Sequence, residues 1–103
     1  MRLAFTPLAE QDLEAIADYI AADNPTRALS FVRELRAQCQ RITLNPPGYR
    51  LRSELGDGIR SCAHGHYVIF FESESDSDAV LILRILHGAR DIPAVFGGDA
   101  EQP

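Results

Sequence analysis

The segment from Gly58 to Asp91 constrains the fold more than any other part of the sequence. It contains apolar runs rich in β-branched and aromatic residues, interrupted by the acidic, serine-rich segment Glu72–Asp78. Such runs, bounded by polar turn residues, are typical of strands in antiparallel hairpins. The last run closes on Arg84, His87 and Arg90. Because burial of an unpaired charge is costly, basic residues at the end of a buried strand need a partner in the fold or a role in binding.

The preceding part of the chain predicts a short first strand and two helices. Residues 2–6 alternate weakly between polar and apolar, which suits a strand. Thr6-Pro7 and Asn24-Pro25 each combine a helix N-cap with a proline at the first helical position, so a helix is expected to begin at each. Apolar residues then recur at helical spacing, at Leu13, Ile16, Ala17 and Ile20 in the first helix and at Ala28, Phe31, Val32, Leu35, Cys39 and Ile42 in the second.

Three further strands are expected at Ile59–His64, His66–Ser73 and Ala79–Leu86. The element order is therefore β-α-α-β-β-β, an α+β fold. In this fold an N-terminal short strand and an antiparallel helical hairpin pack on a mainly antiparallel sheet of three to four strands. We expect a single domain over residues 1–97 and a flexible polar tail at 98–103.

Composition excludes several classes of protein. The 103 residues, 46% of them hydrophobic, suffice for one core. No apolar run approaches the roughly 20 residues that span a bilayer, and the N-terminus lacks the apolar block of a signal peptide. We therefore expect a cytoplasmic protein without a membrane partner. All ten basic residues are arginine and the formal net charge is -5, so autonomous nucleic-acid binding, which a basic field usually drives, is disfavoured.

Cofactor chemistry has little support in the sequence. Cys39 and Cys62 both lie inside apolar patterns, so reduced thiols packed in the core are expected. The carboxylates of Glu72–Asp78 do not specify the loop geometry that oxygen ligands of a cation require. We expect neither a metal site nor a cofactor.

Several short motifs follow one another with a specific spacing. They are Asp12-Leu13, Ile16–Ile20, Asn24–Ala28, Phe31–Leu35, Pro47-Gly48, Glu54–Arg60, Tyr67–Phe71 and Leu83–Asp91. Together they resemble the RelE/ParE superfamily of type II toxin–antitoxin toxins, over about residues 3–91. The Arg84–Asp91 ending is most like the ParE branch.

This resemblance implies a function by analogy. RelE-like members are ribosome-dependent endoribonucleases that cut mRNA, whereas ParE-like members keep the fold and poison DNA gyrase. Both are silenced by a cognate antitoxin. The expectation for this chain is a non-enzymatic, ParE-like toxin of a plasmid-stabilisation type. It would inhibit gyrase and form a hetero-oligomer with a ParD-like or similar antitoxin.

Two alternatives stay open. In a RelE-like endoribonuclease, Arg60 and Arg84 would hold the scissile phosphate. The general acid or base would then come from His64, His66, His87 or Tyr67. Against this, Phe96 has no ionisable group where many nucleolytic relatives present one. The other alternative is a ParE-like binding protein with another target or without toxicity.

The target-binding candidates, taken from the family by analogy, are Arg84, His87, Arg90 and Arg60. Each also has a purely structural explanation. Arg84 would pair with Glu54 or Asp91, His87 would cap the last strand, and Arg60 would pair with a carboxylate.

The antitoxin-binding surface is predicted from the run Val68-Ile69-Phe70-Phe71, which is apolar on both alternations. One side of this strand would pack on the helices and the other would accept an added chain. The candidates for that contact are Val68, Phe70, Ile82 and Leu86. Alternatively, the segment Ile92–Phe96 folds back over the same surface.

Overall fold

A computed structural model of the chain describes residues 1–74, 76 and 78–101, with the backbone alone described for 97–101. The elements in chain order are β1 (Arg2–Phe5), α1 (Pro7–Ala21), α2 (Pro25–Ile42), the 3₁₀ turn η1 (Pro46–Gly48), β2 (Arg50–Leu51), β3 (Arg60–His64), β4 (Tyr67–Glu74), β5 (Ala79–His87) and α3 (Ile92–Glu101). The α+β fold predicted from the sequence is thereby confirmed.

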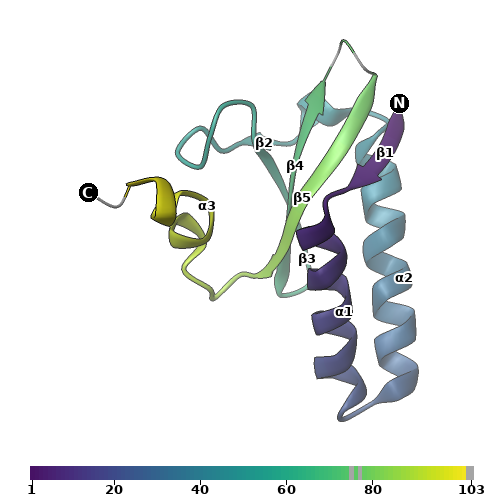
Figure 1. The fold of residues 1–103 in the computed structure, drawn as a ribbon. Coiled ribbons are helices and arrows are strands. Elements are labelled where there is room, and N and C mark those ends of the chain that lie inside the picture. The colour runs from purple at the N-terminus through teal and green to yellow at the C-terminus, as the bar shows by residue number, and fades with distance from the viewer. Residues whose placement is uncertain (75, 77, 102–103) are drawn as a thin grey trace.

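The strands form one five-stranded sheet in the order β1-β5-β4-β3-β2. Strand β1 is parallel to β5, and the other neighbours are antiparallel. The hairpin of α1 and α2 covers one face of the sheet, and α3 lies on the other side (Figure 1). The sequence did not predict β2 or α3. Residues 98–101 of the expected tail belong to α3, and residues 102–103 lie outside the described residues.

Both predicted helix starts are confirmed by their caps. The Thr6 side-chain oxygen accepts a hydrogen bond from the Ala9 N–H at 3.0 Å, and the Asn24 side-chain oxygen accepts one from the Arg27 N–H at 3.0 Å. A proline follows each cap, where its missing N–H costs nothing and its fixed φ suits a helix. Local chemistry therefore positions both helices of the hairpin.

Two hydrophobic clusters hold the layers together. The larger one joins the helical hairpin to the sheet. Its fully buried residues include Leu35, Cys39, Ile42, Ile69, Phe71, Val80 and Ile82. The smaller cluster lies on the opposite face, where Phe70 and Leu86 pack against Ile92 of α3 and against Ile59. Phe70 and Phe71 are adjacent and both fully buried, so the sheet is covered on both faces here.

A β-bulge changes which face of the sheet each residue of β5 occupies. Phe70 pairs with Arg84 but Phe71 pairs with Ile82, so Leu83 is skipped. An extra residue reverses the in–out alternation beyond it. Ile82 consequently faces the helices, while Leu86 faces α3. The predicted antitoxin surface assumed strict alternation along β5, which would place Ile82 and Leu86 on the same face.

Within the described residues, no helix combines the length and the hydropathy that crossing a bilayer requires.

Candidate functional site

Three of the predicted site residues come together where β5 ends. Tyr67 opens β4 directly opposite His87, the last residue of β5. The Tyr67 ring meets the His87 ring edge-on at 5.3 Å, and the His66 ring lies nearly parallel to the His87 ring at 6.0 Å. Gly65 makes the turn before His66 with φ +59°, a value that glycine adopts without strain. The turn thus places an imidazole beside the strand end.

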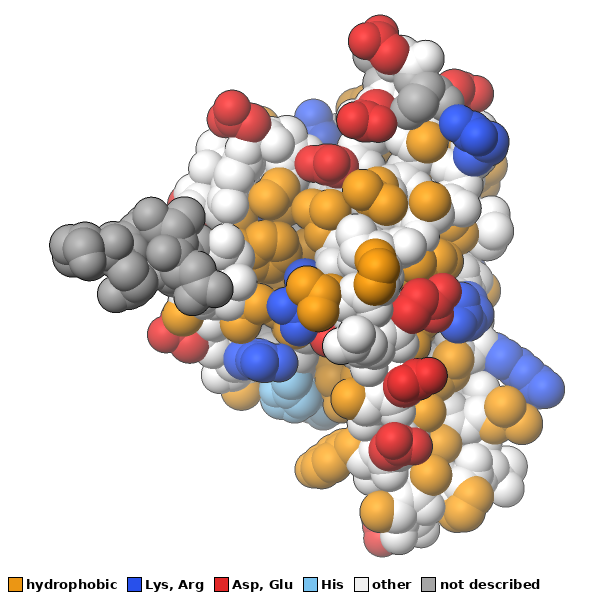
Figure 2. All heavy atoms as spheres, viewed as in Figure 1, with side chains coloured by type: hydrophobic (Ala, Val, Ile, Leu, Met, Phe, Trp, Pro, Cys, Tyr) orange, Lys and Arg blue, Asp and Glu red, His pale blue; other side chains and the backbone are white. Residues whose placement is uncertain are grey.

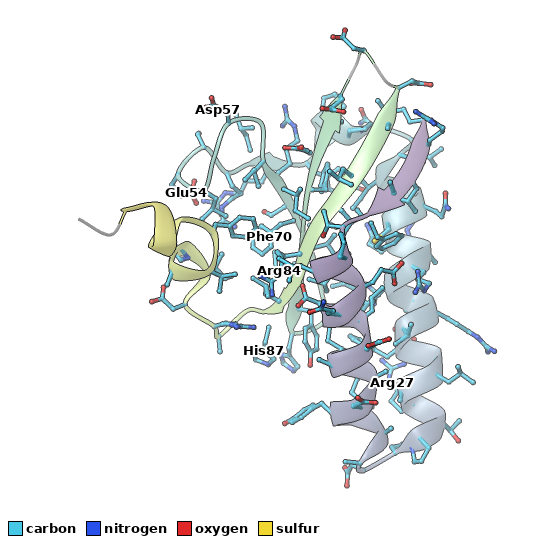
Figure 3. The ribbon with its side chains drawn as sticks, in the orientation of Figure 1. Arg27, Glu54, Asp57, Phe70, Arg84 and His87 are labelled. Atoms are coloured by element: carbon cyan, nitrogen blue, oxygen red, sulfur yellow. The ribbon has the colours of Figure 1, made fainter. Side chains whose placement is uncertain are left out.

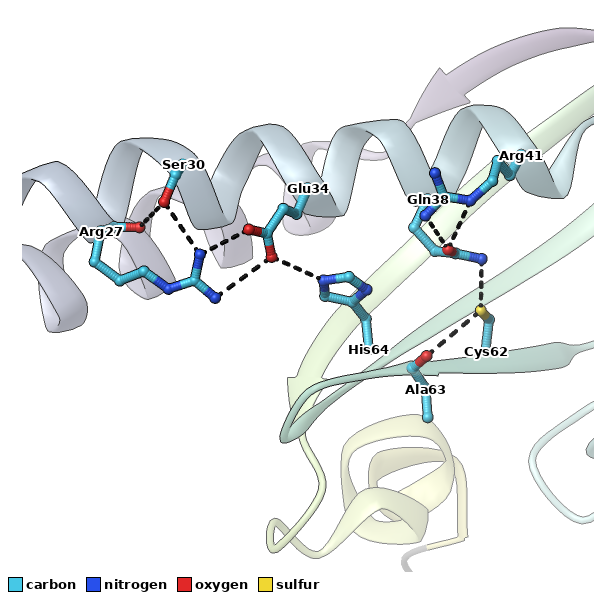
Figure 4. A network of polar contacts seen from close by, with 8 residues as sticks. All are labelled: Arg27, Ser30, Glu34, Gln38, Arg41, Cys62, Ala63 and His64. Atoms are coloured by element: carbon cyan, nitrogen blue, oxygen red, sulfur yellow. Dashed lines mark hydrogen bonds and ion pairs between the residues drawn. The ribbon is translucent and has the colours of Figure 1, made fainter.

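The same end of the sheet carries a polar network from α2 (Figure 4). The Arg27 guanidinium donates to the Glu34 carboxylate at 2.7 Å, and a His64 ring nitrogen lies 3.3 Å from the same carboxylate. Arg27 also lies over the Phe31 ring at 5.0 Å. The hydrogen bond from Arg27, and next the one with His64, lower the pKa of the Glu34 carboxyl below its usual value. This network anchors β3 to α2.

Arg84 has a structural partner. Its guanidinium donates two hydrogen bonds to the Asp12 carboxylate, from Nε at 2.8 Å and from Nη2 at 3.0 Å. The partner is therefore neither of the predicted residues, Glu54 and Asp91. The hydrogen bond to Asp12 raises the pKa of Arg84. Figure 3 shows Arg84 and His87 near α1, with Phe70 beside Arg84.

Arg60 does not join this group. It lies at the opposite end of β3 from His64, and its guanidinium donates to the backbone carbonyls of Tyr49 at 2.8 Å and Pro47 at 3.5 Å. The carboxylate partner predicted for it was wrong, because the loop after α2 offers free carbonyl oxygens instead. Arg60 fixes that loop against the sheet.

A cleft lies between α1 and the end of the sheet, and we call it the tyrosine cleft. It consists of two hollows, of about 170 Å³ and about 420 Å³, that share Tyr19, Tyr67 and His87. Arg90 lines the smaller hollow, and Arg27 and His66 line the larger one. Figure 2 shows histidine side chains beside arginine and apolar side chains next to the lower part of α1. His87 and Arg90 thus line the same hollow, and their contact with the target stays a prediction.

Tyr19 lines both hollows of this cleft but was not among the residues predicted to bind the target or the antitoxin. It is 77% exposed, an unusual state for a large aromatic side chain. The available signal was its position outside the apolar stripe of Leu13, Ile16 and Ile20. Burial raises the pKa of the neighbouring Tyr67, with a smaller contribution from Tyr19. The Tyr67 hydroxyl therefore keeps its proton at neutral pH and can donate a hydrogen bond.

The predicted antitoxin surface is divided by the fold. Val68, Phe70 and Leu86 share the outer face of the sheet, but Ile82 is fully buried under the helices. Phe70 and Leu86 are themselves covered. The Phe96 ring meets the Phe70 ring edge-on at 5.0 Å. The segment Ile92–Phe96 therefore folds back over this surface, as the alternative prediction stated.

Cys39 and Cys62 are free thiols in the core, as expected. Among residues 1–74, 76 and 78–101, no three His, Cys, Asp or Glu side chains are grouped to hold a metal ion. The expectation of no cofactor stays a prediction.

The fold, the helical hairpin and the order of the motifs together define a toxin of a type II toxin–antitoxin system, of the RelE/ParE superfamily. Residues 3–92 match the family model of the ParE toxin of the type II toxin–antitoxin system parDE. The chain therefore belongs to the ParE toxin family.

Solved structures agree with this assignment. The chain is similar to one described as the chromosomal ParDE TA system from P. aeruginosa, with 26% identity, a TM-score of 0.70 and coverage of 84% of this chain and 95% of the other. It is also similar to the toxin–antitoxin complex RelBE2 from Mycobacterium tuberculosis, with 25% identity, a TM-score of 0.57 and the same coverage of both chains. A comparison with curated proteins gives no match.

Proposed function

We propose that this chain is a cytoplasmic, ParE-like toxin that inhibits DNA gyrase and is neutralised by a ParD-like antitoxin. The observation that carries the proposal is the match to the ParE family model over residues 3–92. The likeness to a ParDE system supports an antitoxin as the partner. Gyrase inhibition rests on membership of the ParE branch.

The engagement of two arginines favours a binding mechanism over RNA cleavage. Cleavage would need fixed cations on the scissile phosphate. Arg84 is bonded to Asp12 and Arg60 to two backbone carbonyls, so both guanidinium groups already have partners. His87 and Arg90, which are exposed and line one hollow, are the better candidates for contact with the target.

One observation favours the endoribonuclease as a second candidate. Three of the four groups predicted as general acid or base lie close together, because the ring centroid of His87 is 5.3 Å from that of Tyr67 and 6.0 Å from that of His66. General acid–base catalysis needs such groups within reach of one substrate. The likeness to RelBE2 is compatible with this candidate.

Inhibition of purified gyrase separates the two candidates. Supercoiling and DNA cleavage by gyrase are measured with the wild-type chain, with His87→Ala and Arg90→Ala together, and with Arg33→Ala, which removes an exposed arginine of α2. We expect the wild type and Arg33→Ala to inhibit equally, and the double variant to lose at least tenfold in potency. Full gyrase activity with the wild type, together with cleaved mRNA on translating ribosomes, would establish the endoribonuclease instead.

A further inference from the structure

The tyrosine cleft has the shape and the lining of a site for a peptide segment. Ile16 and Ile85 contribute apolar surface to one hollow, and Ile20 and Phe31 contribute to the other. Tyr19, which is 77% exposed, lines both hollows together with Tyr67 and His87. Aromatic side chains beside apolar hollows are typical of the residues that contribute most to binding at protein interfaces.

The polar groups of the cleft are mainly donors. Arg90 forms no ion pair with any described residue. The His87 Nδ1 accepts the Ala89 N–H at 3.1 Å, so the proton of the neutral ring is on Nε2, which is left to donate. The one carboxylate in the lining, Asp12, already accepts from Arg84 and from the Ile85 N–H. A ligand that supplies a carboxylate therefore complements this site.

The outer face of the sheet is not available in the same way. Phe70 and Leu86 are at most 2% exposed, because α3 covers them. A partner that docked there would first have to displace Phe96 from Phe70. The tyrosine cleft needs no such rearrangement.

We propose that the tyrosine cleft docks an acidic segment of the antitoxin. The segment places an apolar side chain against Tyr19 and Tyr67, and a carboxylate on Arg90 and the His87 Nε2–H. One carboxylate needs only the local donors of the cleft, whereas a nucleic acid needs an extended basic field that a chain of net charge -5 does not provide. The inference rests on the proposed antitoxin partner, and it implies that the antitoxin covers His87 and Arg90, the residues proposed to contact the target.

The test is the affinity of the toxin for its cognate ParD-like antitoxin, measured by titration calorimetry on the purified proteins. The cleft variants are Tyr19→Ala and Arg90→Glu. Their matched controls are Leu44→Ala, a large apolar side chain that is 82% exposed on another surface, and Arg33→Glu, an exposed arginine of α2. Thermal unfolding of each variant verifies that it is folded, and we expect no change because Tyr19 and Arg90 are exposed.

We expect each cleft variant to raise Kd at least tenfold and each control to stay within twofold of the wild type. The ratio of the Kd of Arg90→Glu to the Kd of the wild type should be smaller at high salt, because the lost contact is between charges. Kd values within twofold of the wild type for both cleft variants would overturn the inference. So would an antitoxin that does not bind the wild-type chain, and this result would also overturn the proposed partner. The gyrase assay is independent, so a chain that binds through the cleft without inhibiting gyrase refutes only the proposed target.

Discussion

The Asp12 carboxylate holds Arg84 by two hydrogen bonds, and it also accepts the Ile85 N–H at 2.9 Å. Strand β1 pairs with β5 only as far as Phe5 and Ile82, after which the chain turns into α1. The open edge of β5 beyond that point presents unpaired backbone groups. Asp12 takes the place of the missing strand partner there, so the ion pair fastens α1 to the edge of the sheet.

Removal of this carboxylate should destabilise the fold. Asp12→Ala leaves the Ile85 N–H and a partly buried Arg84 unpaired, and the expected cost is about 3 kcal/mol in the free energy of unfolding. Arg84→Met removes the charge but leaves the bond from the Ile85 N–H, so a loss of only about 1–2 kcal/mol is expected. Urea denaturation measures both, with Glu14→Gln on the exposed surface of α1 as the control. Equal stability of Asp12→Ala and the wild type would contradict this role.

The Thr6 hydroxyl has two roles, and Thr6→Ala removes both at once. Its hydroxyl caps α1 by accepting the Ala9 N–H, and it donates to the Leu83 carbonyl on the edge of β5 at 2.8 Å. Thr6→Ala should therefore cost about 2 kcal/mol, the sum of a cap and an edge hydrogen bond. Thr6→Ser keeps the hydroxyl and should stay within about 0.5 kcal/mol of the wild type. Asn24→Ala, which removes only a cap, provides the comparison at about 1 kcal/mol.

Sequence patterns predicted the features that local chemistry determines. The caps at Thr6 and Asn24 and the apolar stripes of α1 and α2 depend on residues three or four positions apart, so they are visible in the sequence. Helix α3 gave a weaker signal, because Gly97 and Gly98 are unfavourable in a helix interior. Packing of α3 on Phe70 supplies the stabilisation that its low helix propensity does not provide.

Features that depend on distant parts of the chain were missed. The skipped residue Leu83 has no local signature, yet it moved Ile82 from the predicted antitoxin surface into the core. The partner of Arg84 is Asp12, 72 residues away in sequence, and no local pattern distinguishes Asp12 from the other acidic residues of α1. The tyrosine cleft likewise needs α1 placed beside the end of β5, which no single segment encodes.

Acid should weaken the link between α2 and β3. Arg27 and His64 lower the pKa of Glu34 from its ordinary 4.5, so the folded state holds this carboxylate ionised more strongly than the unfolded chain does. The resulting stabilisation is complete above pH 4.5 and is lost as pH falls through the lowered folded value. The effect is small, since the pair is exposed and screened by solvent.

The melting temperature of the wild type and of Glu34→Gln, recorded between about pH 6 and pH 3, tests this sign. The difference between the two proteins should be largest at pH 6 and should narrow toward pH 3. Glu54 has a pKa lowered by Arg52 and titrates in both proteins, so some acid sensitivity should persist in the variant. A difference that widens on acidification would show that Glu34 is not stabilised as an anion.

Cys39 should be inert in the native protein. Burial, with a smaller contribution from Cys62, raises the pKa of its thiol from 9.0 to about 12. Only the thiolate is nucleophilic, so alkylation by iodoacetamide at pH 8 should proceed through unfolding alone. Mass spectrometry of the Cys62→Ser variant, in which Cys39 is the one remaining cysteine, should find no adduct in buffer and complete labelling in denaturant.

The pKa of the Cys39 thiol is higher in the folded state than in the unfolded chain, so the free energy of unfolding should also fall as pH rises from 9.0 toward 12. Rapid labelling of native Cys39 at pH 8 would mean that α2 separates from the sheet far more readily than the full burial of its residues Leu35, Cys39 and Ile42 implies.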